Sequence, residues 1–140
     1  SQKSACGHSL TLTRPLQLIS IDDDFYKIDD GSPTDCVFIA LDNLFDEHNP
    51  PDLIISGINL GSNMGEDITY SGTASAAMEG VLKGIPSIAI SQVHRGNIEQ
   101  HYDVALAKQT IVQLVTKIFD EKYPLPQRKF LNINIPFIPP

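Results

Sequence analysis

The segment DLIISGINLGSNMGEDITYSGTASAAMEGVLKGIPSIAIS, residues 52–91, contains two short apolar runs separated by a polar loop and a helix-forming stretch. Residues 52–56 and 87–91 have the composition of strands that are buried on both faces of a parallel sheet. Residues 73–83 combine small residues with helix formers, and Gly84 follows where a helix would end. The segment therefore predicts a strand, a helix and a second strand joined by a right-handed crossover, the building block of α/β folds.

The sequence before this segment predicts a hairpin followed by a helix. Residues 9–28 alternate apolar and polar side chains around Pro15, which is typical of extended, edge-like structure. The spacing of apolar residues then becomes helical over residues 33–45. Ser32 and Asp35 have the spacing of a capping box, so we expect this helix to begin at residue 33.

The sequence after the segment predicts one more helix and one more strand. Apolar side chains recur at helical spacing through residues 102–119, and residues 130–136 have the pattern of a strand. The predicted order is therefore strand, helix, strand, helix, strand. We expect an α/β domain in which helices cover the faces of a parallel sheet.

Composition excludes several classes of protein. The 140 residues, 41% of them hydrophobic, suffice for one domain with a buried core. The net charge is −7 and no basic cluster is present, so polymeric nucleic acid is not an expected partner. Two cysteines and four scattered histidines form no zinc motif, and no apolar run is long enough to span a membrane. We expect a cytoplasmic protein that does not bind membranes.

The glycine- and asparagine-rich loop after the first strand of the segment has the position of a ligand site. Open parallel sheets bind ligands at the carboxyl ends of their strands. The loop runs through Ser71, Gly72 and Thr73 into a helix whose first backbone N–H groups have no partner inside the helix. These groups, the positive end of the helix dipole and the two hydroxyls predict a pocket for a small anion such as phosphate.

The composition of this loop also allows interpretations other than a phosphate pocket. Without a ligand, Ser71 or Thr73 would act only as a helix N-cap, worth about 1 kcal/mol, and this alternative stays open. Known nucleotide-binding loops do not apply, because the sequence has neither a P-loop lysine nor a GxGxxG motif. Ser71 lies in YSGT rather than GxSxG, which argues against a serine nucleophile.

Beyond these general features, residues 56–80, SGINLGSNMGEDITYSGTASAAMEG, closely resemble the signature of the SurE family, the stationary-phase survival proteins that act as metal-dependent 5'-nucleotidases. Residues 4–16, 31–37, 84–91 and 131–136 resemble other segments of that family in the same order. The resemblance covers most of the chain. It implies a Rossmann-like three-layer α/β/α sandwich with a mostly parallel sheet and a β-hairpin extension.

The resemblance also implies a set of site residues. Ser4 and Asn59 correspond to ligands of one divalent metal cation. Their neutral oxygens suit magnesium, manganese or calcium better than zinc. The positions that correspond to the family's phosphate-binding residues are Asn63, Ser71, Gly72 and Thr73.

The family's remaining metal ligands are an adjacent aspartate pair at the end of its first strand, and this chain starts after that segment. The catalytic residues are therefore unassigned. Residues 22–24 and 29–30 are aspartates in predicted turns, and we interpret them as solvated carboxylates rather than as this pair. We expect residues 1–140 to form a single SurE-like domain that lacks this N-terminal strand and the family's C-terminal oligomerisation segment.

The function implied by the resemblance is metal-dependent hydrolysis of nucleoside 5'-monophosphates to nucleoside and phosphate, with 3'-nucleotidase and exopolyphosphatase side activities. The implied assembly is a homodimer or homotetramer. Two alternatives are a non-catalytic module that binds nucleotide or phosphate, and a purely structural loop at an oligomer contact.

Several residues near the expected site receive structural interpretations. Cys36 is expected to be buried and unreactive, because nothing nearby would activate a thiol. His8 is expected to organise the loop that contains Ser4. The acidic residues expected to hold loop backbone in place are Asp35, Asp67 and Glu79.

Overall fold

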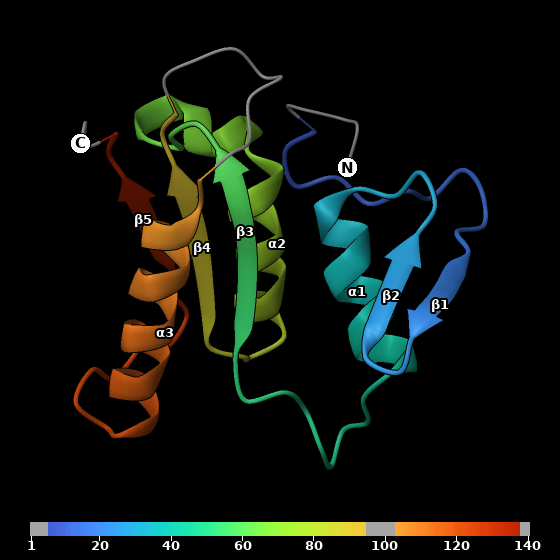
Figure 1. Ribbon diagram of the computed structural model, residues 1–140. Coiled ribbons are helices and arrows are strands. Elements are labelled where there is room, and N and C mark those ends of the chain that lie inside the picture. Colours follow the sequence, from blue (N-terminus) through green and yellow to red (C-terminus); the bar gives the residue numbers. More distant parts are fainter. Residues whose placement is uncertain (1–5, 95–102, 138–140) are drawn as a thin grey trace.

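The computed structural model describes residues 6–94 and 103–137, and Figure 1 shows their arrangement. A parallel sheet in the order β3-β4-β5 forms the middle layer. Helix α2 covers one face of this sheet and helix α3 covers the other (Figure 1). The bounds of these elements are β3 Ile54–Leu60, α2 Gly72–Leu82, β4 Ser87–Gln92, α3 Ala105–Phe119 and β5 Leu131–Ile135. The predicted three-layer α/β/α sandwich is confirmed.

A second unit precedes the sheet in the sequence and lies beside it. Strands β1 and β2 pair in antiparallel fashion, with Leu18 opposite Ile28. Helix α1 lies between this hairpin and α2, and packs against α2 (Figure 1). The bounds are β1 Leu18–Asp22, β2 Phe25–Ile28 and α1 Pro33–Asn43. The predicted hairpin extension is confirmed, although residues 9–17 lie outside any strand.

The predicted helices are all present, with small shifts at their ends. Helix α1 starts at Pro33 behind the Ser32 N-cap, as the capping box predicts. It stops before Phe45, because Leu44 caps the helix and the Asn43 amide donates to the Ile39 carbonyl at 2.8 Å. No helix in the described ranges 6–94 and 103–137 has both the length and the apolar character needed to cross a bilayer.

Strand β3 differs most from expectation. The prediction that it is buried on both faces is wrong, because Ile55 is 47% exposed. Within the described residues, β3 is an edge strand that pairs with β4 alone. By contrast, β4 is buried along its whole length. The strand also runs further than residue 56, because pairing with β4 resumes at Asn59 after a register shift. Asn59 therefore belongs to the strand and not to the following loop.

Gly57 lies inside this register shift, at a position where only glycine fits without strain. Its φ angle is 141°, in the region that favours glycine. A Cβ atom added there would lie 2.5 Å from the Ile90 carbonyl oxygen of β4. The glycine therefore lets β3 approach β4 closely just before the end that carries Asn59.

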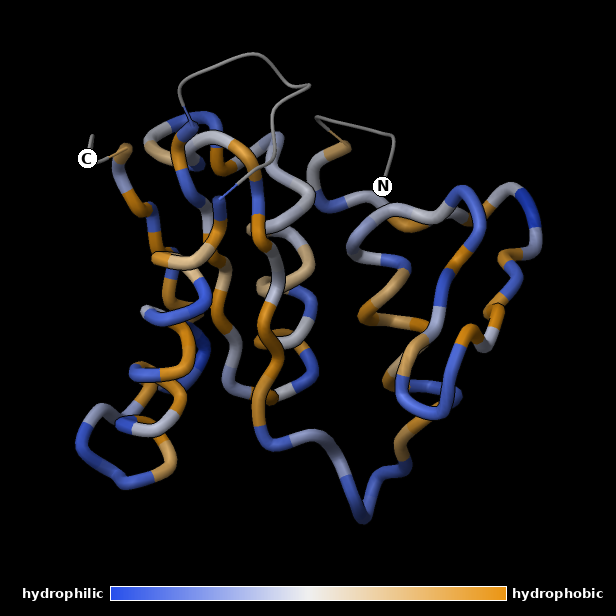
Figure 2. The backbone as a smooth tube through the Cα atoms, in the orientation of Figure 1, coloured by the Kyte–Doolittle hydropathy of each residue, from blue (hydrophilic) through white to orange (hydrophobic). Residues whose placement is uncertain are grey.

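The two faces of the sheet differ in chemistry. On the α3 side, Ile90 and Ile135 pack with Ala107, and Figure 2 shows apolar segments along these strands. The α2 side is built from small and polar residues, and a Cβ on Gly80 of α2 would lie 2.7 Å from the Ile54 side chain. Small residues allow α2 to approach the sheet closely. They leave the carboxyl ends of the strands on this side free for polar side chains.

Candidate functional site

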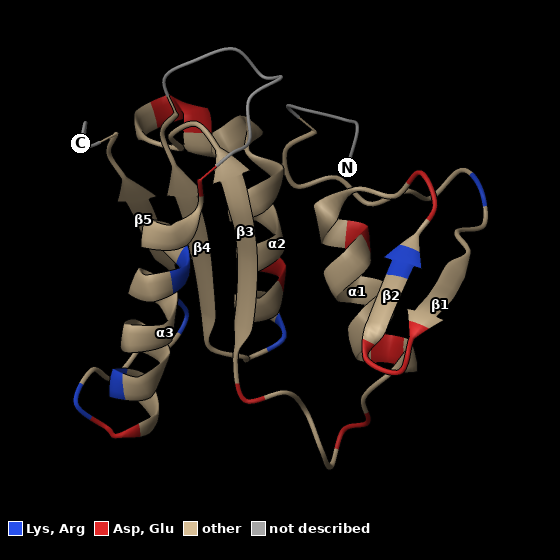
Figure 3. Cartoon of the chain, viewed as in Figure 1, with Lys and Arg blue, Asp and Glu red and all other residues tan. Residues whose placement is uncertain are grey.

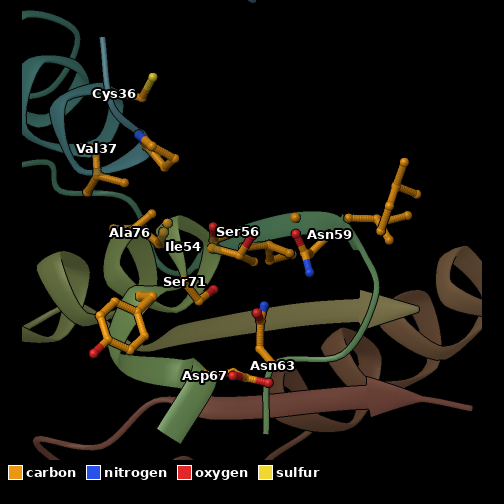
Figure 4. A pocket seen from close by; sticks show the side chains of 17 residues that line it. Cys36, Val37, Ile54, Ser56, Asn59, Asn63, Asp67, Ser71 and Ala76 are labelled. Carbon is orange, nitrogen blue, oxygen red and sulfur yellow. The ribbon is translucent and has the colours of Figure 1, made fainter. Parts of the chain in front are cut away.

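A groove of about 880 Å³ runs along the free edge of β3. Its walls come from β3, the start of α2, the 3-10 helix η1 (Gly65–Tyr70) and one side of α1. Figure 4 shows Ser56, Asn59, Asn63 and Ser71 around one space within it. Five of the six residues assigned from the sequence to phosphate or metal binding therefore line one groove: Asn59, Asn63, Ser71, Gly72 and Thr73.

The start of α2 supplies open hydrogen-bond donors to the groove. The Ser71 Oγ accepts from the Ala74 N–H at 3.1 Å, which confirms Ser71 as the N-cap. Within the described residues, the backbone N–H groups of Gly72 and Thr73 have no acceptor. No acidic residue occupies the first turn of α2. The helix end is thus positive and unfilled, as an anion site requires.

Gly72 has a packing role that the sequence did not suggest. A Cβ atom at Gly72 would lie 2.8 Å from Cγ of Pro33, the first residue of α1. Glycine at this position therefore permits the first turns of α1 and α2 to touch. Gly72 also lines the groove, so the packing role and the predicted phosphate role are compatible.

Asn63 is buried beneath the groove, with 6% of its surface exposed. Its side-chain amide donates to the Ser91 Oγ of β4 at 2.9 Å. Its backbone N–H donates to Asn134 of β5 at 2.7 Å, and its carbonyl accepts from Asn132 and Asn134. The position of Asn63 is therefore fixed by two strands of the sheet, which gives the loop one defined geometry.

Asn59 lies at the end of β3 with one side of its amide already engaged. Its Nδ2 donates to the Gly61 carbonyl at 3.0 Å, and the Gly61 N–H in turn donates to the Gln92 carbonyl at 2.9 Å. These bonds fix the amide orientation, and Oδ1 has no hydrogen-bond donor among the residues that the structure describes. A neutral, oriented oxygen at a strand end has the chemistry of a ligand for a hard cation.

Ser4 lies outside the described residues, but the segment that follows it is anchored beside α2. The Gly7 N–H donates to the Tyr70 carbonyl at 3.1 Å, directly before the Ser71 N-cap. His8 Nε2 lies 2.8 Å from an oxygen of the buried Glu79 carboxylate. The expectation that His8 organises this loop agrees with the contact, and Glu79 acts on a side chain rather than on backbone.

Asp35 holds the loop before α1, as expected. Its carboxylate accepts from the Thr11 N–H at 2.8 Å, the Thr11 hydroxyl at 2.7 Å and the Ser32 N–H at 2.7 Å. Burial alone would raise the pKa of Asp35, but these hydrogen bonds from Thr11 and Ser32 outweigh it and lower the pKa. Asp35 is therefore a charged structural residue.

Two other interpretations need correction. Cys36 was expected to be buried, yet it is exposed and lines the groove, because that side of α1 faces the uncovered edge of β3. Burial of part of the thiol and the nearby Asp35 carboxylate raise its pKa, so the predicted low reactivity stands. No hydrogen bond to the Asp67 carboxylate is found within the described ranges, so the structure does not support a role for it in holding loop backbone.

The electrostatics of the groove come from few charged groups. Within the described part of the chain, its lining contains no lysine or arginine, and Asp67 is its only acidic residue. Figure 3 shows acidic residues on η1 at the same end of the sheet. Among the described residues, the positive potential for an anion therefore comes from the helix-end N–H groups of α2.

Metal-binding clusters of protein side chains are not found in the described residues. No group of three or more histidine, cysteine, aspartate or glutamate side chains there could hold a metal ion. The aspartates at 22–24 flank the hairpin turn, and Asp30 pairs with Arg14 at 2.5 Å, outside the groove lining. Their interpretation as solvated carboxylates agrees with these positions.

Sequence reasoning missed Asn132, Asn134 and Ser91. The available signal was the alternation in LNINIP, residues 131–136, where two asparagines interrupt a buried strand at a spacing of two. A spacing of two places both side chains on one face of a strand. The strand pattern could not predict the partner of these side chains, because Asn63 is 71 residues from Asn134 in the sequence.

The fold and site define an α/β protein that presents a ligand groove at the carboxyl ends of a parallel sheet. Residues 1–140 match the family model described as "Survival protein SurE", so the chain belongs to the SurE family. It is 65% identical over its whole length to "5'-nucleotidase SurE" of Aliarcobacter butzleri (strain RM4018), of which it covers 55%. It is 62% identical over 99% of its length to the protein of that name from Sulfurovum sp. (strain NBC37-1), covering 53%.

A solved structure shares the fold. The SurE protein from Aquifex aeolicus superposes with a TM-score of 0.83 at 47% sequence identity, over 96% of this chain and 52% of that one. The present chain thus spans about half the length of the curated relatives it matches.

Proposed function

We propose that the protein containing this chain hydrolyses nucleoside 5'-monophosphates to nucleoside and phosphate with the help of one divalent cation. The observation that carries this proposal is the meeting of Asn59, Asn63 and the open start of α2 in one groove. The two relatives named above carry the name 5'-nucleotidase, which supports the same reaction. Phosphatase activity on 3'-nucleotides and polyphosphate would use the same phosphate site.

The phosphate is proposed to bind at the start of α2. The N–H groups of Gly72 and Thr73 and the hydroxyls of Ser71 and Thr73 donate to its oxygens, and Asn63 contacts it from the opposite side. The helix end contributes on the order of 0.3 to 1 kcal/mol at an exposed site, and more where water is excluded. As charge develops on the phosphoryl oxygens during hydrolysis, these fixed donors stabilise it.

The cation is proposed to bind next to the phosphate, with Asn59 and Ser4 among its ligands. The Oδ1 of Asn59 fits magnesium, manganese or calcium by its chemistry. A bound divalent cation supplies Lewis-acid polarisation of a phosphoryl oxygen. The described residues provide only part of a coordination shell, so further ligands come from elsewhere in the protein.

The free edge of β3 is the proposed position of those ligands. Within the described residues this edge is unpaired, and Ile55 on it is 47% exposed. A parallel strand added there would end beside Asn59, because the carboxyl ends of parallel strands meet at one edge of the sheet. The aspartate pair of the family lies at the end of such a strand. The proposal therefore places the pair in a segment that precedes residue 1.

A cytoplasmic location and assembly as a homodimer or homotetramer are also proposed. The support for the assembly is membership of the family. The support for the location is the composition, with only two cysteines and no basic cluster.

The test is a phosphate-release assay on the complete protein with a nucleoside 5'-monophosphate and added Mn²⁺ or Mg²⁺. We expect a chelator to abolish turnover, and Asn59→Ala to reduce kcat by at least about 100-fold, since it removes a cation ligand. Asn43→Ala is the matched control, because the Asn43 amide contacts only the exposed turn of α1. Full activity of Asn59→Ala, or activity insensitive to chelator, would contradict the proposal. Binding without turnover would instead indicate a non-catalytic module.

A further inference from the structure

The backbone of Asn63 forms hydrogen bonds with two side chains of β5, the last strand of the sheet. The Asn63 N–H donates to Asn134 Oδ1 at 2.7 Å, and Asn134 Nδ2 donates back to the Asn63 carbonyl at 3.1 Å. Asn132 Nδ2 donates to the same carbonyl at 2.8 Å. One amide side chain thus satisfies both backbone groups of Asn63, and a second strengthens the contact.

The register of the sheet explains why these groups meet. Asn132 and Asn134 are two residues apart on β5, so their side chains lie on one face, while Ile133 between them faces the α3 core. Asn134 pairs in register with Ser91 of β4, whose hydroxyl accepts from the Asn63 side chain at 2.9 Å. Three polar side chains from two neighbouring strands therefore converge on a single loop residue.

Apart from the bonds of Asn63, the hydrogen bonds that hold this loop within the described residues lie at its ends, at Gly61 and between Met64 and Asp67. Gly61 and Gly65 on either side have positive φ angles of 106° and 57°, conformations in which glycine is most permissive. The polar cluster also costs stability, because Asn132 Oδ1 is buried without a partner within the described residues. A polar cluster retained at such a cost points to a requirement for a defined position rather than for stability.

The polar cluster defines the position of the Asn63 side chain. Its Nδ2 carries two hydrogens, and Ser91 accepts one of them. Because Ser91 holds one of these hydrogens, the other points away from Ser91, and Figure 4 shows the Asn63 amide in the space between Asn59 and Ser71. A donor held in this way is preorganised for an oxyanion.

We propose that Asn134, assisted by Asn132, is a positioning residue that holds Asn63 against the phosphate. This inference rests on the proposed function. It assigns β5, which lines no part of the groove, an indirect role in phosphate recognition. Because Asn134 makes two bonds to the Asn63 backbone and Asn132 makes one, the two residues should differ in importance.

The test compares Asn134→Leu, Asn132→Leu and Ile133→Val in the complete protein. Leucine keeps the branching of asparagine at Cγ and removes the hydrogen bonds without adding charge. We expect Asn134→Leu to raise both KM for a nucleoside 5'-monophosphate and the inhibition constant of inorganic phosphate about tenfold, and Asn132→Leu to raise them about threefold. Ile133→Val, on the opposite face, lowers Tm but leaves both constants unchanged. If the changes in KM and in the inhibition constant parallel the changes in Tm across the three variants, the proposal is overturned.

A double-mutant cycle separates positioning from general damage. If Asn134 acts through Asn63, Asn63→Ala combined with Asn134→Leu should bind phosphate no more weakly than Asn63→Ala alone. Additive losses would overturn the proposal. An independent readout is hydrogen exchange at the Asn63 amide, which we expect to be at least about tenfold faster in Asn134→Leu. An unchanged exchange rate would also overturn it.

These readouts keep the inference distinct from the proposed function. If the complete wild-type protein releases no phosphate from nucleotides, the proposed function fails. Affinity for inorganic phosphate in the presence of Mn²⁺, and exchange at the Asn63 amide, then still decide the inference. If inorganic phosphate does not bind the wild-type protein, the inference fails as well.

Discussion

The N-termini of α1 and α2 both begin with a serine N-cap, but they are completed in opposite ways. In α1, the Asp35 carboxylate accepts hydrogen bonds from Ser32 and Thr11 and places a negative charge in the first turn. In α2, Ser71 caps the Ala74 N–H, and the first turn contains no acidic residue. One helix end carries its own anion, and the other is left positive.

The presence or absence of this carboxylate distinguishes the structural N-terminus of α1 from the proposed anion-binding N-terminus of α2. Asp35 is 2% exposed and joins α1 to the preceding loop, so no external anion is needed there. Gly72 and Thr73 line the groove, and their N–H groups have no acceptor within the described residues. A serine N-cap can therefore begin a purely structural helix, where an acidic residue follows in the first turn, or a helix whose N-terminus is open to an anion, where none follows.

The largest expected effect comes from giving α2 the charge that α1 already has. Thr73→Asp places a carboxylate in the first turn of α2, where it would compete with phosphate for the open N–H groups. At an effective dielectric constant near 20, repulsion at a few ångströms weakens phosphate binding by about 100-fold. The inhibition constant of inorganic phosphate measures this change. Thr73→Asn is the neutral control, and equal affinities of the two variants would contradict an anion site at this helix end.

The converse change removes the charge from α1. Asp35→Asn loses a carboxylate that accepts three hydrogen bonds, so we expect the free energy of unfolding to fall by about 2 kcal/mol. Denaturant unfolding measures it, with Asp42→Asn on the exposed side of the same helix as the control. Phosphate affinity should stay unchanged, because Asp35 does not line the groove.

The same variant predicts a pH dependence. The pKa of Asp35 in the folded protein lies below its ordinary value of 3.8. Its stabilising contribution is therefore complete above the unfolded pKa, and is lost as the pH falls from there through the folded pKa. Asp35→Asn should lack this part of the acid-induced loss of stability. An identical acid profile in both proteins would argue against a charged Asp35.

The smallest expected effect concerns the shared N-cap of α2. Ser71→Ala should lower the free energy of unfolding by about 1 kcal/mol, while Ser71→Gly should cost only a few tenths. Thermal unfolding compares the two variants. If Ser71 also contacts phosphate, both variants weaken phosphate binding equally although their stabilities differ. If phosphate affinity instead falls more in Ser71→Ala than in Ser71→Gly, in parallel with stability, then Ser71 acts only as the N-cap.

Local sequence patterns predicted the order of the helices and strands and five of the residues that line the groove. The capping box at Ser32, the apolar run at 87–91 and the helix start at Ser71 are local signals, because caps and strand patterns depend on residues a few positions apart. The motif at residues 56–80 indicated the family, and with it the phosphate-binding candidates. These predictions needed no knowledge of distant contacts.

The surroundings of those residues depend on how the elements pack together. The tertiary structure showed that β3 is an exposed edge, that Cys36 lines the groove, and that Gly72 is required by Pro33. It also brought Asn134 to Asn63 across 71 positions of sequence. Burial, edge position and long-range hydrogen bonds arise when separate elements pack together, and no local pattern records which elements will become neighbours.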